Sequence, residues 1–323
     1  MKRREFLGAA GATLAASALP HTAARAAQWP DKPVKFILPY APGGATDLVA
    51  RPWAEMLTKA FNQQFVLEHR GGAGGMIGTE AASKAAADGY TFLLTPNATM
   101  TVLPNLRKTP YDPMKSFDPV GRVGDLVTGF VIHPSVGPKT FKEMVEYAKK
   151  NPGKLTYGSA GLGTATQMRL EMLKFKAGID ILHVPYRGSA DALNDLLPGN
   201  VQMMNEINVL PHVKAGKLIL LNINHSARNP DFPDTPTLTE LGMPDADVPI
   251  WYSVWAPAGT PKEIITTFNA KIVELAKGDD MKARLRAINT QAPIQTPEEM
   301  RAYLELDSKR NADLIKTANI KLE

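Results

Sequence analysis

Residues 34–47 read VKFILPYAPGGATD, and this stretch decides the fold. Its first part, Val34 to Leu38, is a short apolar run, which predicts a buried strand. Pro42 to Gly44 ends that strand. Apolar residues then recur at helical spacing from Thr46 to about Phe61, which predicts a helix. A strand, a glycine-bearing turn and a helix in this order make the first half of a βαβ unit.

The same succession of strand, turn and helix continues along the chain. Short apolar runs predict further strands at Phe65–Glu68, Tyr90–Thr95, Lys154–Ser159, Ile181–Val184, Val201–Ile207 and Leu218–Asn222. Helical patterns and helix-start signals predict helices at Thr140–Lys150, Thr164–Ala177 and Ser189–Leu197, and after the Thr-Pro pairs at Thr260 and Thr296. Alternating strands and helices are typical of an α/β fold, here with two mostly parallel sheets flanked by helices.

The two sheets are predicted to form two lobes joined by two hinge strands. We expect the chain to cross between the lobes near residues 122–129 and to return near residues 247–254. Residues 27–124 plus 247–323 are therefore assigned to lobe 1, and residues 125–246 to lobe 2. A chain of this length is more naturally two lobes than one.

Residues 1–26 are predicted to be an export signal, cleaved near Ala26. Lys2-Arg3-Arg4 gives a positive start, Phe6 to Leu19 a short apolar segment, and Ala24-Arg25-Ala26 a cleavage site. The adjacent arginines followed by Glu5-Phe6-Leu7 resemble a twin-arginine signal. The sequence therefore predicts a periplasmic protein.

The charge of the chain argues against nucleic acid as a partner. The formal net charge is +5, from 37 basic and 32 acidic side chains. The predicted signal holds four of the basic residues and one of the acids, a net +3, which leaves the remainder near +2. That remainder contains no run of Lys and Arg of the kind that neutralises phosphates.

The residue types of metal and thiol sites are missing or scattered. The chain has no cysteine, which excludes thiol catalysis and thiolate metal sites. The histidines that follow the signal stand at no metal-like spacing. Dinucleotide and phosphate-loop signatures are also missing. We therefore expect no metal and no cofactor.

Three predicted strand-to-helix junctions share one design, in which glycine follows a strand and a Ser or Thr precedes a helix. They are Tyr40–Asp47, Ser159–Thr164 and Pro185–Ser189. The first N–H groups of a helix lack partners inside it and lie at the positive end of its dipole, and glycine lets a bound group approach them closely. In α/β sheets such junctions lie where ligands bind. They predict a site for a small anion such as a carboxylate.

An exported α/β hydrolase-like enzyme is the alternative interpretation. It would combine Ser159 with His183 and an acid such as Glu206. Ser159 follows Tyr157-Gly158 and so misses the Gly-x-Ser-x-Gly pattern of a nucleophile elbow. Glu206 ends a predicted apolar strand, either as a solvated strand end or as a cleft acid that contacts a hydroxyl or amine of a ligand.

Several segments carry a resemblance to a known family. They are Trp29–Pro33, Pro39–Asp47, Gly71–Gly75, Asp88–Thr91, Ser159–Thr164, His183–Ser189 and Ala256–Pro261. In this order they resemble the Bug family, the substrate-binding proteins of tripartite tricarboxylate transporters. The resemblance implies a two-lobed, type II-like periplasmic-binding-protein fold that closes on a carboxylate and is not an enzyme. Its partner would be the permease of such a transporter or a sensor that signals without transport, and we expect a monomer.

The resemblance also implies which residues bind the ligand. The expected contacts from lobe 1 are Tyr40, Ala41, Gly43, Gly44, Thr46 and Asp47. The expected contacts from lobe 2 are Ser159, Gly163, Thr164, Ala165 and the neighbourhood of Arg187. Glu206 is added because of its place at a strand end. The segment Asn205–Asn208 departs from the Asp-Asn pair usual in the family at that strand end.

Overall fold

The computed structural model describes residues 29–321 of the 323-residue chain. The export signal predicted at residues 1–26 lies outside the described residues. Within residues 29–321, no helix is both long enough and apolar enough to cross a membrane.

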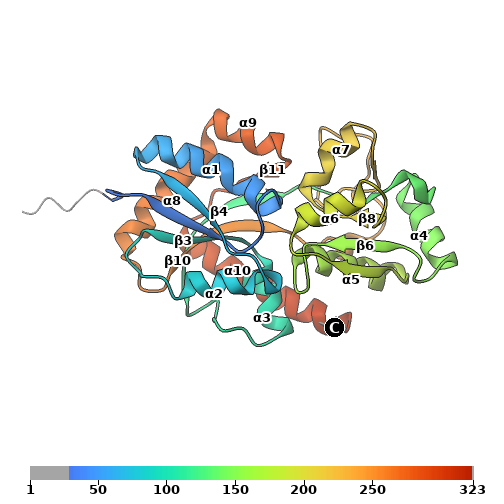
Figure 1. Ribbon diagram of the computed structural model, residues 1–323, viewed down its shortest axis with the longest axis horizontal. Coiled ribbons are helices and arrows are strands. Elements are labelled where there is room, and N and C mark those ends of the chain that lie inside the picture. The colour runs from blue at the N-terminus through green and yellow to red at the C-terminus, as the bar shows by residue number, and fades with distance from the viewer. Residues whose placement is uncertain (1–28, 322–323) are drawn as a thin grey trace, which may run out of the picture.

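The first lobe is built on a six-stranded sheet between two layers of helices (Figure 1). Its strands, in spatial order, are β11 (Thr290–Gln291), β4 (Phe117–Leu126), β10 (Trp251–Pro257), β3 (Thr91–Pro96), β1 (Val34–Leu38) and β2 (Phe65–His69). One layer contains α1 (Ala45–Phe61), α8 (Lys262–Lys277) and α9 (Asp279–Ala287). The other contains α2 (Met76–Ser83), α3 (Leu103–Leu106) and α10 (Pro297–Thr317).

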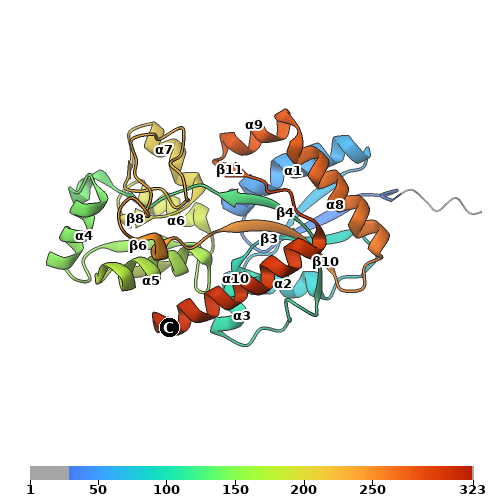
Figure 2. The ribbon, with the colours of Figure 1, turned by 180° about the vertical axis from the view of Figure 1, so that it is seen from behind.

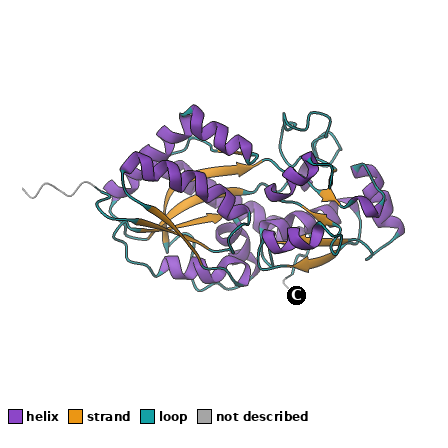
Figure 3. Ribbon diagram, turned by 45° about the horizontal axis from the view of Figure 1, so that its top comes forward, coloured by secondary structure: helices purple, strands orange, loops and turns teal. Residues whose placement is uncertain are grey.

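The second lobe is built on a five-stranded sheet. Its strands, in spatial order, are β7 (Leu182–Pro185), β6 (Thr156–Ser159), β8 (Met203–Met204), β5 (Val131–Ile132) and β9 (Ile219–Leu220). Its helices are α4 (Phe141–Lys150), α5 (Ala165–Ala177), α6 (Ser189–Leu196) and α7 (Leu210–Lys214). Buried residues of α4 and α5 share one core, and those of α6 share another with the start of α7, so this sheet is also covered by helices (Figure 3).

The two-lobed α/β architecture is confirmed, but both sheets are mixed rather than mostly parallel. In the first sheet β1 runs parallel to β2 and β3, whereas β10 runs antiparallel to β3 and to β4. In the second sheet β5 runs antiparallel to both of its neighbours. The reason in the first sheet is the hinge: β4 carries the chain out of lobe 1 and β10 brings it back in the opposite direction.

The strand predicted at Val201–Ile207 is much shorter than expected. Only Met203 and Met204 form strand β8, and a 3₁₀ turn begins at Ile207. The backbone carbonyl of Glu206 accepts a hydrogen bond from the Thr128 hydroxyl at 2.9 Å instead of pairing with a neighbouring strand. The chain therefore leaves the sheet at the point where its polar residues begin.

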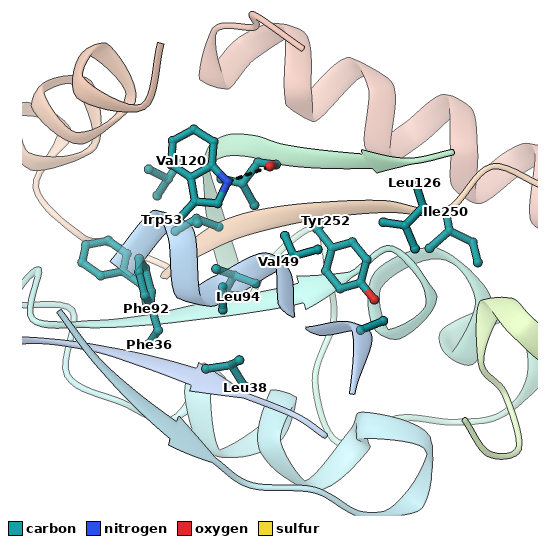
Figure 4. Close-up of a cluster of buried hydrophobic side chains, with 14 of the residues drawn as sticks. Phe36, Leu38, Val49, Trp53, Phe92, Leu94, Val120, Leu126, Ile250 and Tyr252 are labelled. Carbon is teal, nitrogen blue, oxygen red and sulfur yellow. Dashed lines mark hydrogen bonds between the residues drawn. The ribbon is translucent and has the colours of Figure 1, made fainter. Parts of the chain in front are cut away.

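Trp53 stands at the centre of the first core. The Trp53 side chain is fully buried between α1 and the sheet, and its indole Nε1–H donates to the carbonyl oxygen of Val123 at 2.8 Å (Figure 4). Phe36, Phe92 and Leu94 of the central strands are buried in the same cluster. This packing fixes α1, and therefore the turn that precedes it, against the sheet.

The chain crosses between the lobes twice, as Figure 2 shows from behind. It leaves β4 at Leu126 and enters β5 at Val131, and it returns through residues 247–250 into β10 at Trp251. The return falls inside the predicted range of residues 247–254, whereas the outward crossing, residues 127–130, overlaps the predicted range of residues 122–129 and ends one residue beyond it.

Asp307 ties the C-terminal helix α10 to the first sheet. Its carboxylate Oδ2 is buried and accepts hydrogen bonds from Asn97, Thr101 and Trp251 at 3.1, 2.8 and 3.1 Å. Removing it would leave several buried donors without an acceptor, and each such loss costs about 1–3 kcal/mol.

We therefore expect Asp307→Ala to lower the free energy of unfolding by about 3 kcal/mol, measured by urea denaturation. Asp313→Ala, at an exposed position of the same helix, is the matched control and should change it by less than about 0.5 kcal/mol. Equal effects of the two substitutions would contradict this role of Asp307.

Candidate ligand-binding cleft

A narrow cleft, partly open to solvent, lies between the two lobes. From lobe 1 it is lined by Tyr40, Ala41, Gly44, Ala45, Thr46, Pro96, Ile250 and Tyr252. From lobe 2 it is lined by Ala160, Thr164, Ala165, Thr166, Ser189 and Glu206. The cleft therefore contains residues from all three of the glycine-bearing junctions.

The first junction is shaped from behind by Asp47. This carboxylate is 2% exposed, and its Oδ2 accepts from the Gly43 backbone N–H at 3.0 Å and from Arg51 Nε at 2.9 Å. On the other side of the turn, His69 Nδ1 lies 3.1 Å from the carbonyl oxygen of Tyr40. Asp47 is therefore committed to holding the turn, and its neighbours Gly44 and Thr46 reach the cleft.

The second junction is shaped by hydroxyl groups. The Thr164 side chain caps α5 by accepting from the Gln167 backbone N–H at 3.4 Å, and it donates to the Gly161 carbonyl at 2.6 Å. Gly163 donates its N–H to Gln167 Oε1 at 2.6 Å. Ser159 is fully buried, and its Oγ accepts the Gly161 N–H at 3.0 Å. These bonds leave the first turn of α5 facing the cleft.

The N-terminal ends of α1 and α5 thus border one narrow space from opposite lobes. The unpaired N–H groups of each first turn carry the equivalent of about half a positive charge. Two such ends that approach each other favour an anion between them. This arrangement can hold a carboxylate with main-chain donors and hydroxyls, although none of the described residues on the lining is a lysine or an arginine.

The lobes touch each other directly around this cleft. The Ala45 backbone N–H donates to the Ser189 hydroxyl of α6 at 3.0 Å, a bond between lobe 1 and lobe 2. Gly74 meets the carbonyl oxygen of Leu162 so closely that an added Cβ would lie 2.2 Å from it. The two lobes are therefore closed on each other around the cleft.

Apolar packing also joins the lobes. Ala165, Met168 and Met172 on one side of α5 belong to the core cluster of lobe 1, whereas Leu170 and Leu173 belong to the core of lobe 2. Helix α5 is consequently buried on both sides in the closed form. Opening the lobes would expose the methionine side, and flexible thioether side chains adapt readily to such a change of contacts.

Glu206 is the acid of the cleft lining. It is 4% exposed, and its Oε2 has no hydrogen-bond partner. Burial raises the pKa of Glu206 to about 7, against the opposing effect of the Arg169 guanidinium and of the Ile207 backbone N–H. Of the two interpretations that the sequence left open for Glu206, the solvated strand end is wrong, because the strand ends inside the molecule and the side chain is buried on the cleft lining.

The structure separates the expected binding residues into three groups. Those that reach the cleft are Tyr40, Ala41, Gly44, Thr46, Thr164, Ala165 and Glu206. Those that lie behind it and shape its turns are Gly43, Asp47, Ser159 and Gly163. Arg187 is exposed and is not among the lining residues.

Other lining residues were not among the predicted contacts. Ser189 belongs to the third junction, whose serine carried the same helix-start signal as Thr46 and Thr164. Ile250 and Tyr252 lie on the returning hinge segment, where the sequence gives no indication of which face is turned to the cleft. Long-range pairing of strands decides that orientation.

The arrangement expected of a hydrolase is only partly present. Ser159 Oγ lies 2.6 Å from His183 Nε2, and burial lowers the pKa of His183 to about 4. Ser159 is nevertheless fully buried and does not line the cleft, so no substrate carbonyl can reach it there. Within residues 29–321, no group of three or more His, Asp or Glu side chains could hold a metal ion.

Comparisons with known proteins agree with this geometry. A family model described as tripartite tricarboxylate transporter family receptor matches residues 49–320. Protein BugT of Bordetella pertussis is 33% identical over 302 residues, which cover 91% of this chain and 92% of BugT.

Two solved structures of similar proteins contain small carboxylates. R. palustris Rpa4515 with adipate matches with a TM-score of 0.87 and 31% identity, over 91% of this chain and 99% of that one. MatC from Rhodopseudomonas palustris with bound malate matches with a TM-score of 0.84 and 28% identity, over 88% of this chain and 99% of that one.

The close contact between Gly74 and Leu162 across the lobe interface can be tested by substitution. Gly74 and Gly178 both have left-handed backbone angles, with φ +67° and φ +61°. An added Cβ at Gly74 would collide with Leu162 across the lobe interface, whereas at Gly178 it would meet nothing within 4 Å. The backbone strain of an alanine is therefore similar at the two positions, about 1–2 kcal/mol, and only Gly74 concerns closure.

We expect Gly74→Ala to keep the lobes apart and to weaken binding of any ligand held by both lobes by at least about tenfold, a loss of about 1.4 kcal/mol. Solution X-ray scattering should show a larger radius of gyration than for Gly178→Ala, which should bind as the unmodified protein does. An unchanged affinity and radius for Gly74→Ala would show that this contact does not limit closure.

Proposed function

This chain belongs to the tripartite tricarboxylate transporter receptor family, and from this premise we propose that it captures a small carboxylate between its lobes and delivers it to the membrane permease of a transporter. The family and its structural neighbours are periplasmic binding proteins, not enzymes. The buried position of Ser159 agrees with a receptor, because the hydroxyl is part of a turn rather than of a reaction site.

One observation carries the proposal: helix N-termini from both lobes border the same cleft. A carboxylate that binds the first turn of α1 is within reach of the first turn of α5 only when the lobes are closed. The ligand therefore has contacts in the closed form that the open form lacks, and such a difference in affinity is what shifts the equilibrium to closure.

The proposed division of the chain follows from the same picture. Lobe 1 would comprise residues 27–126 plus 247–323 and lobe 2 residues 127–246, each moving as a unit about the two crossings; this boundary is two residues later than the sequence predicts, because β4 continues to Leu126 in the lobe 1 sheet. Residues 1–26 would direct the chain to the periplasm, where receptors of this family act. The closed, loaded monomer would then be the form that the permease recognises.

A thermal-shift screen with di- and tricarboxylates, amino acids and aromatic acids tests the ligand class. A true ligand at a hundredfold excess over its Kd should add about 3 kcal/mol to the free energy of unfolding and raise the melting temperature by several degrees. Matched amides or esters, which lack the charge that the helix ends favour, should give no shift. No shift with any carboxylate at millimolar concentration would contradict the proposal.

Crosslinking of the loaded receptor in its native membrane tests the partner. Recovery of permease subunits would support delivery to a transporter. Recovery of a sensor protein alone would replace transport by signalling and leave the proposed ligand class intact.

A further inference from the structure

Glu206 places a carboxylic acid on the cleft lining, and the binding of an anion does not need such a group. Among the described residues that line the cleft, it is the sole carboxylic acid. A carboxylate ligand and an ionised Glu206 would repel each other in this buried space. The presence of an acid therefore requires a physical reason beyond the binding of a carboxylate.

Arg169, the cation whose charge acts on Glu206, does not donate a hydrogen bond to Glu206 Oε2. Arg169 of α5 is fully buried, donating through Nε to the Val248 carbonyl at 2.8 Å and through Nη1 to Asn205 Oδ1 at 2.7 Å. Its Nη2 has no hydrogen-bond partner, and neither has Glu206 Oε2. The guanidinium thus acts on Glu206 through its charge and leaves the oxygen without a donor.

The neighbouring phenol groups are also committed elsewhere. The Glu206 charge acts on Tyr40, Tyr157 and Tyr252, and together with the larger effect of burial it raises the pKa of each. Tyr40 donates its hydroxyl to the Gly74 carbonyl at 2.9 Å, and Tyr157 donates to the Thr166 carbonyl at 3.0 Å. The Tyr252 hydroxyl forms no hydrogen bond to Glu206 Oε2 either, because this oxygen has no partner among the described residues. Within residues 29–321 no group therefore donates to Glu206 Oε2.

We propose that Glu206 is a specificity residue that selects carboxylates carrying a hydrogen-bond donor, a protonated amine or a hydroxyl, close to the carboxylate. This inference rests on the proposed function and names the class of its ligand. The helix ends take the carboxylate, and the donor of the same molecule meets Glu206 Oε2. A buried acceptor that such a ligand satisfies, and an unsubstituted acid does not, discriminates strongly between the two.

Matched acids test the proposal. Succinate, malate and aspartate share one dicarboxylate skeleton and differ only in carrying hydrogen, hydroxyl or ammonium at one carbon. Propionate, lactate and alanine form the corresponding series of monocarboxylates. Titration calorimetry should show that a substituted member of at least one series binds at least about tenfold more tightly than the unsubstituted member, since hydrogen bonds to charged groups are among the strong ones.

Variants of Glu206 assign the preference to this side chain. Glu206→Gln keeps the size and an acceptor oxygen but removes the charge, so it should lose the preference for the amine and retain part of a preference for the hydroxyl. Glu206→Ala should lose both. Glu146→Gln, at an exposed position of α4, is the control and should bind as the unmodified protein does.

The pH dependence gives a second measurement that needs no variant. The pKa of Glu206 is raised to about 7, so its charge is lost as the pH falls from about 8 to 6. Affinity for an amine-bearing acid should therefore fall over this range, because the ammonium loses its anionic partner. Affinity for an unsubstituted acid should instead rise, because a protonated Glu206 no longer repels it.

The outcomes separate this inference from the proposed function. Equal or tighter binding of the unsubstituted acids, or a preference that survives in both Glu206 variants, would overturn the role of Glu206 while leaving a carboxylate receptor. No binding of any acid in either series to the unmodified protein would count against both. If the Glu206 variants do not fold, the matched acids and the pH profile of the unmodified protein still decide.

Discussion

Two positive helix ends held a short distance apart are the constraint on which the rest of this structure depends. Helices α1 and α5 begin at the same cleft from different lobes, and their unpaired N–H groups repel each other unless a partner of opposite polarity lies between them. The Ser189 hydroxyl meets this need in part, by accepting the Ala45 N–H across the interface. A carboxylate would meet it more fully, and in the proposed function this would couple ligand binding to lobe closure.

The turns that present these helix ends depend on side chains behind them. Asp47 holds the first turn through the Gly43 N–H, and Ser159 and Thr164 hold the second through the backbone of Gly161. Each of these polar groups is buried and partnered by the main chain, so the geometry of the donors is set before a ligand arrives. Preorganised main-chain donors would let the proposed anion site form although no basic residue is among its described lining residues.

Local sequence signals predict the positions of most helices and strands well. They predict poorly which residues lie between the lobes. The bounds of β1 were predicted as the structure has them, because a run of apolar residues closed by Pro42 to Gly44 leaves little choice. The strand at Val201–Ile207 was overestimated, because Asn205 and Glu206 bond to groups distant in sequence. Arg187 shared a motif with Ser189, yet only Ser189 lines the cleft, since side-chain direction around a turn depends on how the lobes meet.

The hydrogen bonds at the two crossings show where one lobe gives way to the other. On the way out, the Val127 N–H donates to the Asn289 carbonyl of lobe 1, and the Thr128 hydroxyl donates to the Glu206 carbonyl of lobe 2. On the return, the Val248 carbonyl accepts from Arg169 of lobe 2, and the Pro249 carbonyl accepts from Asn97 of lobe 1. A bend between Val127 and Thr128 on the way out, and between Val248 and Pro249 on the return, would leave the bonds to lobe 1 and the bonds to lobe 2 intact. Glu206 and Arg169 belong to the bonds with lobe 2, so the acid of the cleft would move with the hinge end of that lobe. A ligand that bonds to Glu206, as proposed, would then act directly on the element that closes.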